Sequence, residues 1–551
     1  MTSFPYWWQN GVIYRIYPKS FQDTTGSGTG DLRGVTQRLD YLQKLGVDAI
    51  WLTPFYVSPQ VDNGYDVANY TAIDPMYGTL DDFDELVTQA KSRGIRIILD
   101  MVFNHTSTQH AWFREALNKE SPYRQFYIWR DGEPETPPNN WRSKFGGSAW
   151  HWHAESKQYY LHLFTPEQAD LNWENPAVRN ELKKICVFWA KRGISGLLFN
   201  VVNLISKDIC FPYDLDGNGL YYYTDGLRAH EFLHEMNSDI FTPYRLMTAG
   251  EMSPTCLAHG QRYAALTGSE LSMILTNQHL EVDYSGGEKW TLTKPDYVTL
   301  KALFLHWQQG MHNIAWNGLF WCNQNQPRIV SRFGDDGEYR VPAAKMLAMV
   351  LHGMQGTPYI YQGEEIGMTN PHFTSITDYR DPESISIYTK LSNNGRDAAE
   401  LLAILASKSR DNSRTPMQWS NSENAGFTTG KPWIGLCDNF REINVETALI
   451  DKDSVFYTYQ KLITLRKKEP ILTWGNYQDL LPTSPVLWCY RRQWQKQILL
   501  VVANLSREIQ LWKPMQIRGP WKVLMHNYEE VPPHPISMSL RPFEAIWWLL
   551  K

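Results

Sequence analysis

The sequence predicts an α/β fold: a (β/α)8 barrel with a subdomain inserted after its third strand and a C-terminal antiparallel β-sandwich. Three observations lead to this prediction. Short β-branched runs alternate with longer amphipathic segments over most of the 551 residues. A stretch rich in Trp and Pro interrupts that alternation from residue 106, and from about residue 478 only strand-like runs follow.

The first three strand candidates are rich in β-branched and aromatic residues, and amphipathic segments separate them. The strands are VIYRIYP (12–18), VDAIWLTPF (47–55) and IRIILDMVF (95–103), and the helices are GVTQRLDYLQKLG (34–46) and TLDDFDELVTQAKSRG (79–94). Because parallel strands need a long crossover between them, this alternation predicts βα units.

Five later strand candidates bring the total to the eight that a TIM barrel needs. They are SGLLFNVV (195–202), RLMTAGEM (245–252), LSMILTN (271–277), GLFWCNQN (318–325) and TPYIYQGEEIG (357–367). The active site of such a barrel lies at the C-terminal ends of its strands. Charged and amide side chains stand at those ends here.

The places where the alternation of strands and helices stops predict the domain boundaries. The segment RDGEPETPPNNWRSKFGGSAWHWH lies within a stretch that is too long for a simple loop. LWCYRRQ, QILLVVANLS and FEAIWWLL look like strands of an antiparallel sheet. We expect a barrel from residues 1–105 and 174–477, an inserted subdomain from 106–173 and a β-sandwich from 478–551.

The composition narrows the function classes. A 43% hydrophobic fraction with 20% charged residues is that of a globular protein, and a net charge of -5 gives no indication of a nucleic-acid partner. No apolar run approaches the roughly 18 residues of a membrane helix. The N-terminal segment shows no signal peptide, and the six cysteines are scattered without metal or redox spacing. We therefore expect a cytoplasmic protein.

Aromatic residues make up 14% of the chain. Rings with polar edges suit sugars, whose C–H faces stack on them while the hydroxyls form hydrogen bonds. Most of these rings are expected in the core, but the composition is compatible with a carbohydrate ligand.

Five motifs occur in one order along the chain: DNGYDV (62–67), DMVFNH (100–105), GLLFNVVN (196–203), GEM (250–252) and CNQNQP (322–327). In this order they resemble the α-amylase superfamily, glycoside hydrolase family 13, over essentially the whole chain. The segments WWQNGVIY, VDNGYDVANY, QADLNWENP and DNSRTPMQWS are similar to the oligo-1,6-glucosidase branch, and within it to the trehalose-6-phosphate hydrolases.

The resemblance implies a retaining glycosidase with a carboxylate nucleophile and a carboxyl acid/base. By position Glu251 is the acid/base. Asn200 stands at the nucleophile position and Leu198 at that of its arginine partner. Gln324 and Asn325 stand where the family has a His–Asp pair that stabilises the transition state.

The resemblance also implies which residues hold the sugar. Asp62, Tyr65 and Arg414 are expected to contact the glucose at the non-reducing end, and Asp100 and His105 to shape the site. The alternative is that Asp100, His105 and Glu251 persist only as structural hydrogen-bond partners.

The four replaced groups predict a loss of hydrolysis. An amide cannot form the glycosyl ester, and losing a covalent nucleophile typically costs ~10⁴ to 10⁶ in rate, or about 5–8 kcal/mol. We therefore expect a catalytically inactive homologue of trehalose-6-phosphate hydrolase that binds an α-glucoside or an unknown protein partner. One alternative is an enzyme with weak or altered activity relying on Glu251. Another is an ancillary interaction protein.

Two binding sites follow less directly from the resemblance. Lys289 is the basic residue expected near a substrate phosphate, although Glu281 nearby opposes it or is a solvated surface residue. Oxygen-bearing side chains at Asp23, Thr25, Ser27 and Asp31 resemble a calcium loop. The alternative for that loop is a Gly-rich turn packed under the barrel. No cofactor is expected to be required.

Overall fold

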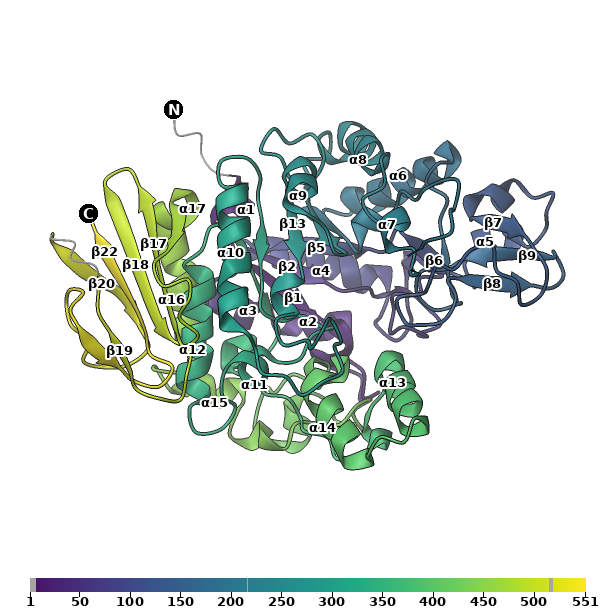
Figure 1. Ribbon diagram of the computed structural model, residues 1–551. Helices are drawn as coiled ribbons and strands as arrows, with labels where there is room; N and C mark the ends of the chain where they lie inside the picture. Colours follow the sequence, from purple (N-terminus) through teal and green to yellow (C-terminus); the bar gives the residue numbers. More distant parts are fainter. Residues whose placement is uncertain (1–5, 216, 515–518) are drawn as a thin grey trace. The chain divides into compact units, whose positions relative to one another are not determined.

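The computed structural model describes residues 6–215, 217–514 and 519–551. Eight parallel strands form one sheet in the order β13-β12-β11-β5-β2-β1-β15-β14 (Figure 1). Their bounds are β1 (Ile13–Ile16), β2 (Ala49–Leu52), β5 (Arg96–Met101), β11 (Gly196–Phe199), β12 (Met247–Met252), β13 (Met273–Thr276), β14 (Gly318–Leu319) and β15 (Thr357–Tyr361). The predicted barrel is confirmed.

Helices follow the strands along the chain. The longer ones are α4 (Leu80–Ser92), α6 (Pro176–Lys191), α10 (Tyr297–Met311), α12 (Arg340–His352) and α16 (Val455–Lys468). Helix α6 shows why such segments begin where they do. The side chain of Asn175 accepts a hydrogen bond from the backbone N–H of Ala177, and Pro176 occupies the first helical position.

By its internal contacts the chain divides into two compact units. One comprises residues 1–50, 92–95 and 278–551, and is called the first unit below. The other comprises residues 51–91 and 96–277, and is called the second unit. The domain boundaries expected from the sequence stay a prediction.

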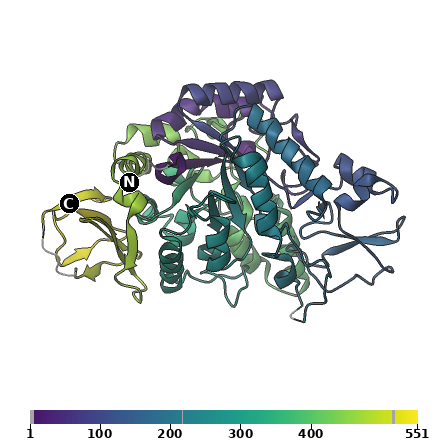
Figure 2. The same cartoon turned by 90° about the horizontal axis from the view of Figure 1, so that it is seen from above.

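The C-terminal strands lie in the first unit and form two sheets. The larger is antiparallel, with β16 (Asn476–Asp479), β17 (Leu487–Trp494), β18 (Gln497–Asn504), β22 (Ala545–Leu550) and β20 (Trp521–His526) in that order. The smaller pairs β19 (Gln510–Trp512) with β21 (Met538–Leu540). Trp512 of the smaller sheet stacks on Trp548 of the larger one at 5.5 Å. These sheets, yellow in Figure 2, confirm the predicted β-sandwich.

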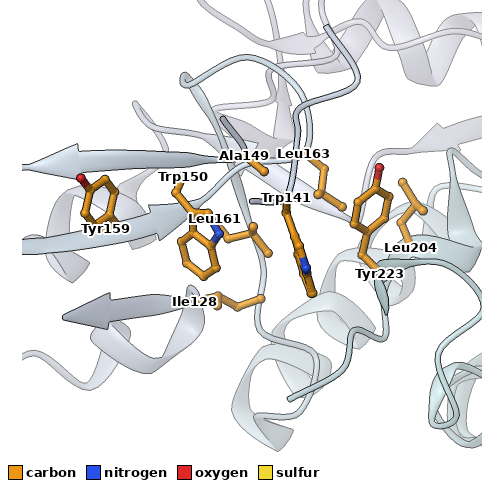
Figure 3. Close-up of a cluster of buried hydrophobic side chains, with 9 residues drawn as sticks. All are labelled: Ile128, Trp141, Ala149, Trp150, Tyr159, Leu161, Leu163, Leu204 and Tyr223. Atoms are coloured by element: carbon orange, nitrogen blue, oxygen red, sulfur yellow. The ribbon is translucent and has the colours of Figure 1, made fainter. Parts of the chain in front are cut away.

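The inserted segment lies in the second unit and contains short strands. β6 (His105–Ser107) pairs with β10 (Gln168–Asp170), and β7 (Trp129–Asp131), β9 (Gln158–Leu161) and β8 (Trp150–His153) form a separate sheet. Trp141 and Trp150 are buried in the core of this segment, together with Tyr223 from a later part of the chain (Figure 3). The aromatic richness of residues 106–173 therefore builds a small core.

No helix in the described ranges is both long enough and apolar enough to cross a membrane.

Candidate active site

The ends of β11 and β12 bring Asn200 and Glu251 together. Leu198 is in register with Ala249, and side chains two residues apart in a strand point to the same face. Asn200 and Glu251, each two positions further on, therefore reach the same level. The amide Nδ2 of Asn200 donates a hydrogen bond to Oε2 of Glu251 at 3.0 Å. The structure thus places the expected acid/base next to the expected nucleophile position.

Leu198 lies on the same strand and is fully buried. It is also in register with Asp100 at the end of β5. An arginine at this position would have to be neutralised by neighbouring carboxylates, because an unpaired buried charge costs several kcal/mol. Leucine with a neutral amide at Asn200 removes that requirement.

Asp62, Tyr65 and Asp100 are linked by hydrogen bonds. The hydroxyl of Tyr65 donates to Oδ2 of Asp100 at 3.3 Å. The amide of Gln168 donates to Oδ2 of Asp62 and to the carbonyl of Tyr65, both at 3.3 Å. All are buried. The site expected from DNGYDV and DMVFNH is therefore assembled, and Gln168 of β10 is a member that sequence reasoning missed.

His105 is fixed among three polar neighbours. Its Nε2 lies 3.1 Å from the carbonyl oxygen of Tyr65 and 3.2 Å from the side-chain amide nitrogen of Gln168, and its Nδ1 lies 3.2 Å from the side-chain amide nitrogen of Asn104. An amide nitrogen can only donate, so Nδ1 faces a donor, whereas Nε2 faces both a donor and an acceptor. Burial lowers the pKa of His105 below its ordinary value, although Asp170 opposes this. The neutral ring is a hydrogen-bonding group for a polar ligand.

Lys207 is a second residue that the sequence analysis missed. Its Nζ pairs with Oδ2 of Asp170 at 2.8 Å and donates to Oδ1 of Asn104 at 2.9 Å, and all three residues are buried. Asp170 belongs to the motif QADLNWENP, so the sequence could have indicated Asp170 as a site residue, and through it this ion pair. The pair fixes Asn104, which in turn holds His105.

The remaining expected site residues belong to the first unit. Arg414 is fully buried, and its Nε donates to the carbonyl of Gln324 at 2.8 Å while Nη2 donates to Oδ1 of Asn325 at 2.9 Å. Asp381 and Asp411 lie 3.7 and 3.9 Å from its Nη1. Arg414 and the two amides occur in separate sequence motifs, and hydrogen bonds join them in the structure.

Lys289 is part of an ion-pair network. Its Nζ lies 2.8 Å from Oε2 of Glu383, which lies 3.5 Å from Nε of Arg410. Arg410 pairs with Asp381 at 2.5 Å. Burial works against the charge of Asp381, but Arg410 and Arg414 hold the pKa of that carboxyl well below its ordinary value. Lys289 is therefore already engaged by a carboxylate that a substrate phosphate would have to displace.

The candidate calcium loop is closed by its own hydrogen bonds. Asp23 accepts from the backbone N–H groups of Thr25 and Gly28, each at 2.8 Å, and from the hydroxyl of Thr428. Asp31 caps a helix by accepting from the N–H of Gly34 at 2.7 Å. In the described ranges no group of three or more His, Cys, Asp or Glu side chains could hold a metal ion. This donor set fits a self-sufficient turn better than a cation site.

The whole chain is similar to characterised glycosidases. It is 81% identical to trehalose-6-phosphate hydrolase from Escherichia coli over 100% of both chains. It is 44% identical to oligo-1,6-glucosidase from Bacillus cereus over 99% of both. The crystal structure of trehalose-6-phosphate hydrolase from Bacillus licheniformis superposes with a TM-score of 0.96 at 52% identity, covering 99% of this chain and 100% of that one.

These comparisons correct the expectation of a catalytically inactive homologue. Identity of 81% across the full length of a trehalose-6-phosphate hydrolase supports an active enzyme. The expectation took the four replaced groups together as the loss of the whole reaction, and the comparison with an 81% identical hydrolase overturns it. Glu251 keeps its place beside Asn200 at the ends of neighbouring strands.

The family follows from the extent of the match. The model of the alpha amylase catalytic domain matches residues 15–475, which is most of the chain. With the barrel, the strand-end site and the relatives above, the chain belongs to the α-amylase family, glycoside hydrolase family 13.

Proposed function

We propose that the chain is an active glycoside hydrolase of small α-glucosides, with trehalose 6-phosphate as the substrate to test first. The observation that carries the proposal is the hydrogen bond of 3.0 Å from Asn200 to Glu251. It holds a largely buried carboxyl group at a barrel strand end, where the active sites of this fold lie. The substrate class comes from the two trehalose-6-phosphate hydrolases that are 81% and 52% identical to almost the whole chain.

Glu251 serves in this proposal as the proton donor. When the bond between the anomeric carbon and the glycosidic oxygen breaks, the departing oxygen takes the proton of Glu251. A water molecule then bonds to the anomeric carbon and returns a proton to the Glu251 carboxylate. General acid–base catalysis of this kind typically contributes 10²–10⁴-fold.

Asn200 has a positioning role in this scheme. Its neutral amide cannot form a covalent glycosyl ester, so the reaction passes through no enzyme-bound ester. Its Nδ2 donor orients the Glu251 carboxyl group. We therefore expect turnover that is slower than in a site with a paired carboxylate nucleophile.

The sugar would be held by the groups already linked to one another. Asp62, Asp100 and His105 offer acceptors and a neutral ring for hydroxyl groups, and the Tyr65 hydroxyl fixes Asp100. These roles are part of the proposal.

We also propose that the protein is located in the cytoplasm. All six cysteines belong to the described residues, and all are free. Disulfides are rare in reducing compartments, so free thiols agree with the cytoplasm.

One assay tests the proposed function. The purified chain is incubated with trehalose 6-phosphate and with trehalose, and released glucose is measured beside the Glu251→Gln variant. We expect release that this substitution removes. Glu288→Gln, at an exposed position, is the matched control and should leave the rate unchanged. No release from any α-glucoside, or release that survives Glu251→Gln, would overturn the proposal.

A further inference from the structure

A cavity of about 360 Å³ lies in the second unit beside β7. Its walls include Trp129, Arg130, Asn172, Lys207 and Phe211. This volume falls within the range of small-molecule sites, and a mixture of rings, amides and cations is typical of sites for polar ligands. None of the residues expected to act on the substrate lines it.

Two arginines supply its charge. The guanidinium of Arg124 stacks on the Trp129 ring at 3.4 Å, and that of Arg130 stacks on the Phe211 ring at 4.2 Å. Arg124 donates to the carbonyl of Ala116 and to Gln158, and Arg130 donates to the carbonyls of Trp129 and Ile209.

Among the residues that the structure describes, neither guanidinium group forms an ion pair within 4 Å. The carboxylate of Asp131 nevertheless acts on Arg124 from a greater distance. Burial lowers the pKa of Arg124 to about 10 against the opposing effect of Asp131, so this group remains protonated at neutral pH, and burial also lowers the pKa of Arg130. Stacking on rings holds each plane in place without neutralising it. The cavity therefore presents two guanidinium groups held in place, and the charge of Arg124 is partly offset by Asp131.

Part of the wall rests on a hydrophobic core. Phe211 packs against the buried cluster that contains Ile128, Trp141 and Trp150, and Figure 3 shows the residues of this cluster. The one acidic side chain in the lining, Glu174, pairs with Arg228 and so opposes an incoming anion less than a free carboxylate would. The side chains of Gln125 and Asn172 add donors and acceptors for hydroxyl groups.

The cavity also connects to the candidate active site within the same unit. Lys207 in its wall donates to Asn104 at 2.9 Å, and Asn104 lies 3.2 Å from His105. A ligand that attracts the ammonium group of Lys207 would change the partner that fixes His105. Occupancy of the cavity thus has a physical route to the polar groups proposed to hold the sugar.

We propose that this cavity is a second binding site, for a phosphorylated sugar. The phosphate would accept hydrogen bonds from the guanidinium groups of Arg124 and Arg130, and the hydroxyl groups would meet the amides. Binding of a phosphorylated sugar to this cavity does not require that the protein hydrolyses glycosides. Only an effect of this binding on turnover rests on the proposed function.

Calorimetric titration of the full chain with glucose 6-phosphate, inorganic phosphate and glucose tests the proposal. We expect glucose 6-phosphate to bind more tightly than phosphate, and glucose to bind weakest. Arg130→Gln should weaken glucose 6-phosphate binding at least tenfold. Ile209→Glu places a carboxylate at the rim, where this side chain is 65% exposed, and should weaken it without disturbing the core, whereas Ile209→Lys should not weaken it.

The Lys289→Met variant distinguishes binding in the cavity from binding in the candidate active site. It should leave the binding of glucose 6-phosphate to the cavity unchanged. Loss of this binding in Lys289→Met with retention in Arg130→Gln and Ile209→Glu would overturn the proposal. So would the absence of any heat at millimolar glucose 6-phosphate, or equal binding of glucose and glucose 6-phosphate. Equal binding of phosphate and glucose 6-phosphate would overturn the assignment of a sugar. Because the measurement is of binding, a chain without hydrolytic activity still gives a decisive result.

Discussion

The side-chain amide of Asn200 donates a hydrogen bond to Oε2 of Glu251 at 3.0 Å, so a neutral group orients the carboxyl group of this site. In a retaining glycosidase the partner of the acid/base is a second carboxylate. A carboxylate at this distance would repel Glu251, whereas an amide attracts it. In the proposed reaction, proton transfer therefore depends on this one carboxyl group and on the groups that position it.

Glu251→Gln is expected to lower kcat by about 10²–10⁴, which is the usual contribution of a general acid. The glutamine keeps the shape of the side chain, so the melting temperature should stay within a few degrees of the unmodified value. Glucose release and thermal unfolding of the same preparations check both statements. An unchanged kcat in a folded variant would show that another group supplies the proton.

Restoring the charged groups is expected to raise turnover. Leu198→Arg, Asn200→Asp, Gln324→His and Asn325→Asp introduced together should increase kcat by ~10⁴ to 10⁶, because a nucleophile then shares the work of Glu251. Leu198→Arg alone should instead destabilise the protein, since it buries a charge at a fully buried position. Burst kinetics and unfolding curves provide the two measurements. A folded quadruple variant without faster turnover would show that the pocket differs elsewhere.

The barrel was predictable from periodicity, but some elements were not. The expected strand over residues 318–325 is only Gly318–Leu319, and at the far end of the expected range the N–H of Asn325 bonds to the side chain of Asn323. The expected helix over 34–46 is broken at Arg38, whose guanidinium stacks over Trp419 at 4.0 Å. Tertiary contacts overrode local preference in this helix.

The site was predictable residue by residue but not as a network. Glu251 and Asp100 stand in motifs that can be read from the sequence. The pairing of Lys207 with Asp170 spans 37 residues and depends on how the inserted segment folds back, which no local pattern encodes. The prediction of inactivity failed for a similar reason, because it judged single positions without the groups that surround them.

The pairing of Lys289 with Glu383 is expected to control phosphate recognition. Lys289→Met should raise KM for trehalose 6-phosphate about tenfold and leave KM for trehalose unchanged, because only the former carries an anion. Glu383→Gln should lower KM for trehalose 6-phosphate, since the ammonium group is then free of its carboxylate at 2.8 Å. Steady-state kinetics with both substrates provide the test. Equal effects on both substrates would make this pair purely structural.

The loop at Asp23 is expected to hold itself closed without a cation. Asp23→Ala should lower the free energy of unfolding by about 1–3 kcal/mol, because buried donors from Gly28 and Thr428 lose their acceptor. A chelator should leave the melting temperature of the unmodified chain unchanged. A melting temperature that rises with Ca²⁺, and does so only when Asp23 is present, would instead establish the calcium site.

Glu364 is expected to make stability depend on pH. Its buried carboxyl accepts a hydrogen bond from Tyr459 at 2.6 Å, and burial raises its pKa to about 8, with Glu365 adding to the effect. Because the pKa of Glu364 is higher in the folded than in the unfolded chain, the protonated carboxyl group contributes its full stabilisation only below the unfolded-state pKa of 4.5. This contribution to the free energy of unfolding is lost as the pH rises from 4.5 through 8.

Glu364→Gln removes the titrating group and keeps its shape. Between pH 5 and 8 the unmodified chain should lose up to about 1.4 kcal/mol per pH unit relative to this variant. Urea unfolding across that range measures the difference, with Glu423→Gln at an exposed position as the control. Parallel pH profiles for Glu364→Gln and the unmodified chain would mean that Glu364 is ionised in the folded protein. The buried carboxyl would then have to be stabilised by its hydrogen-bond partners more strongly than burial destabilises it.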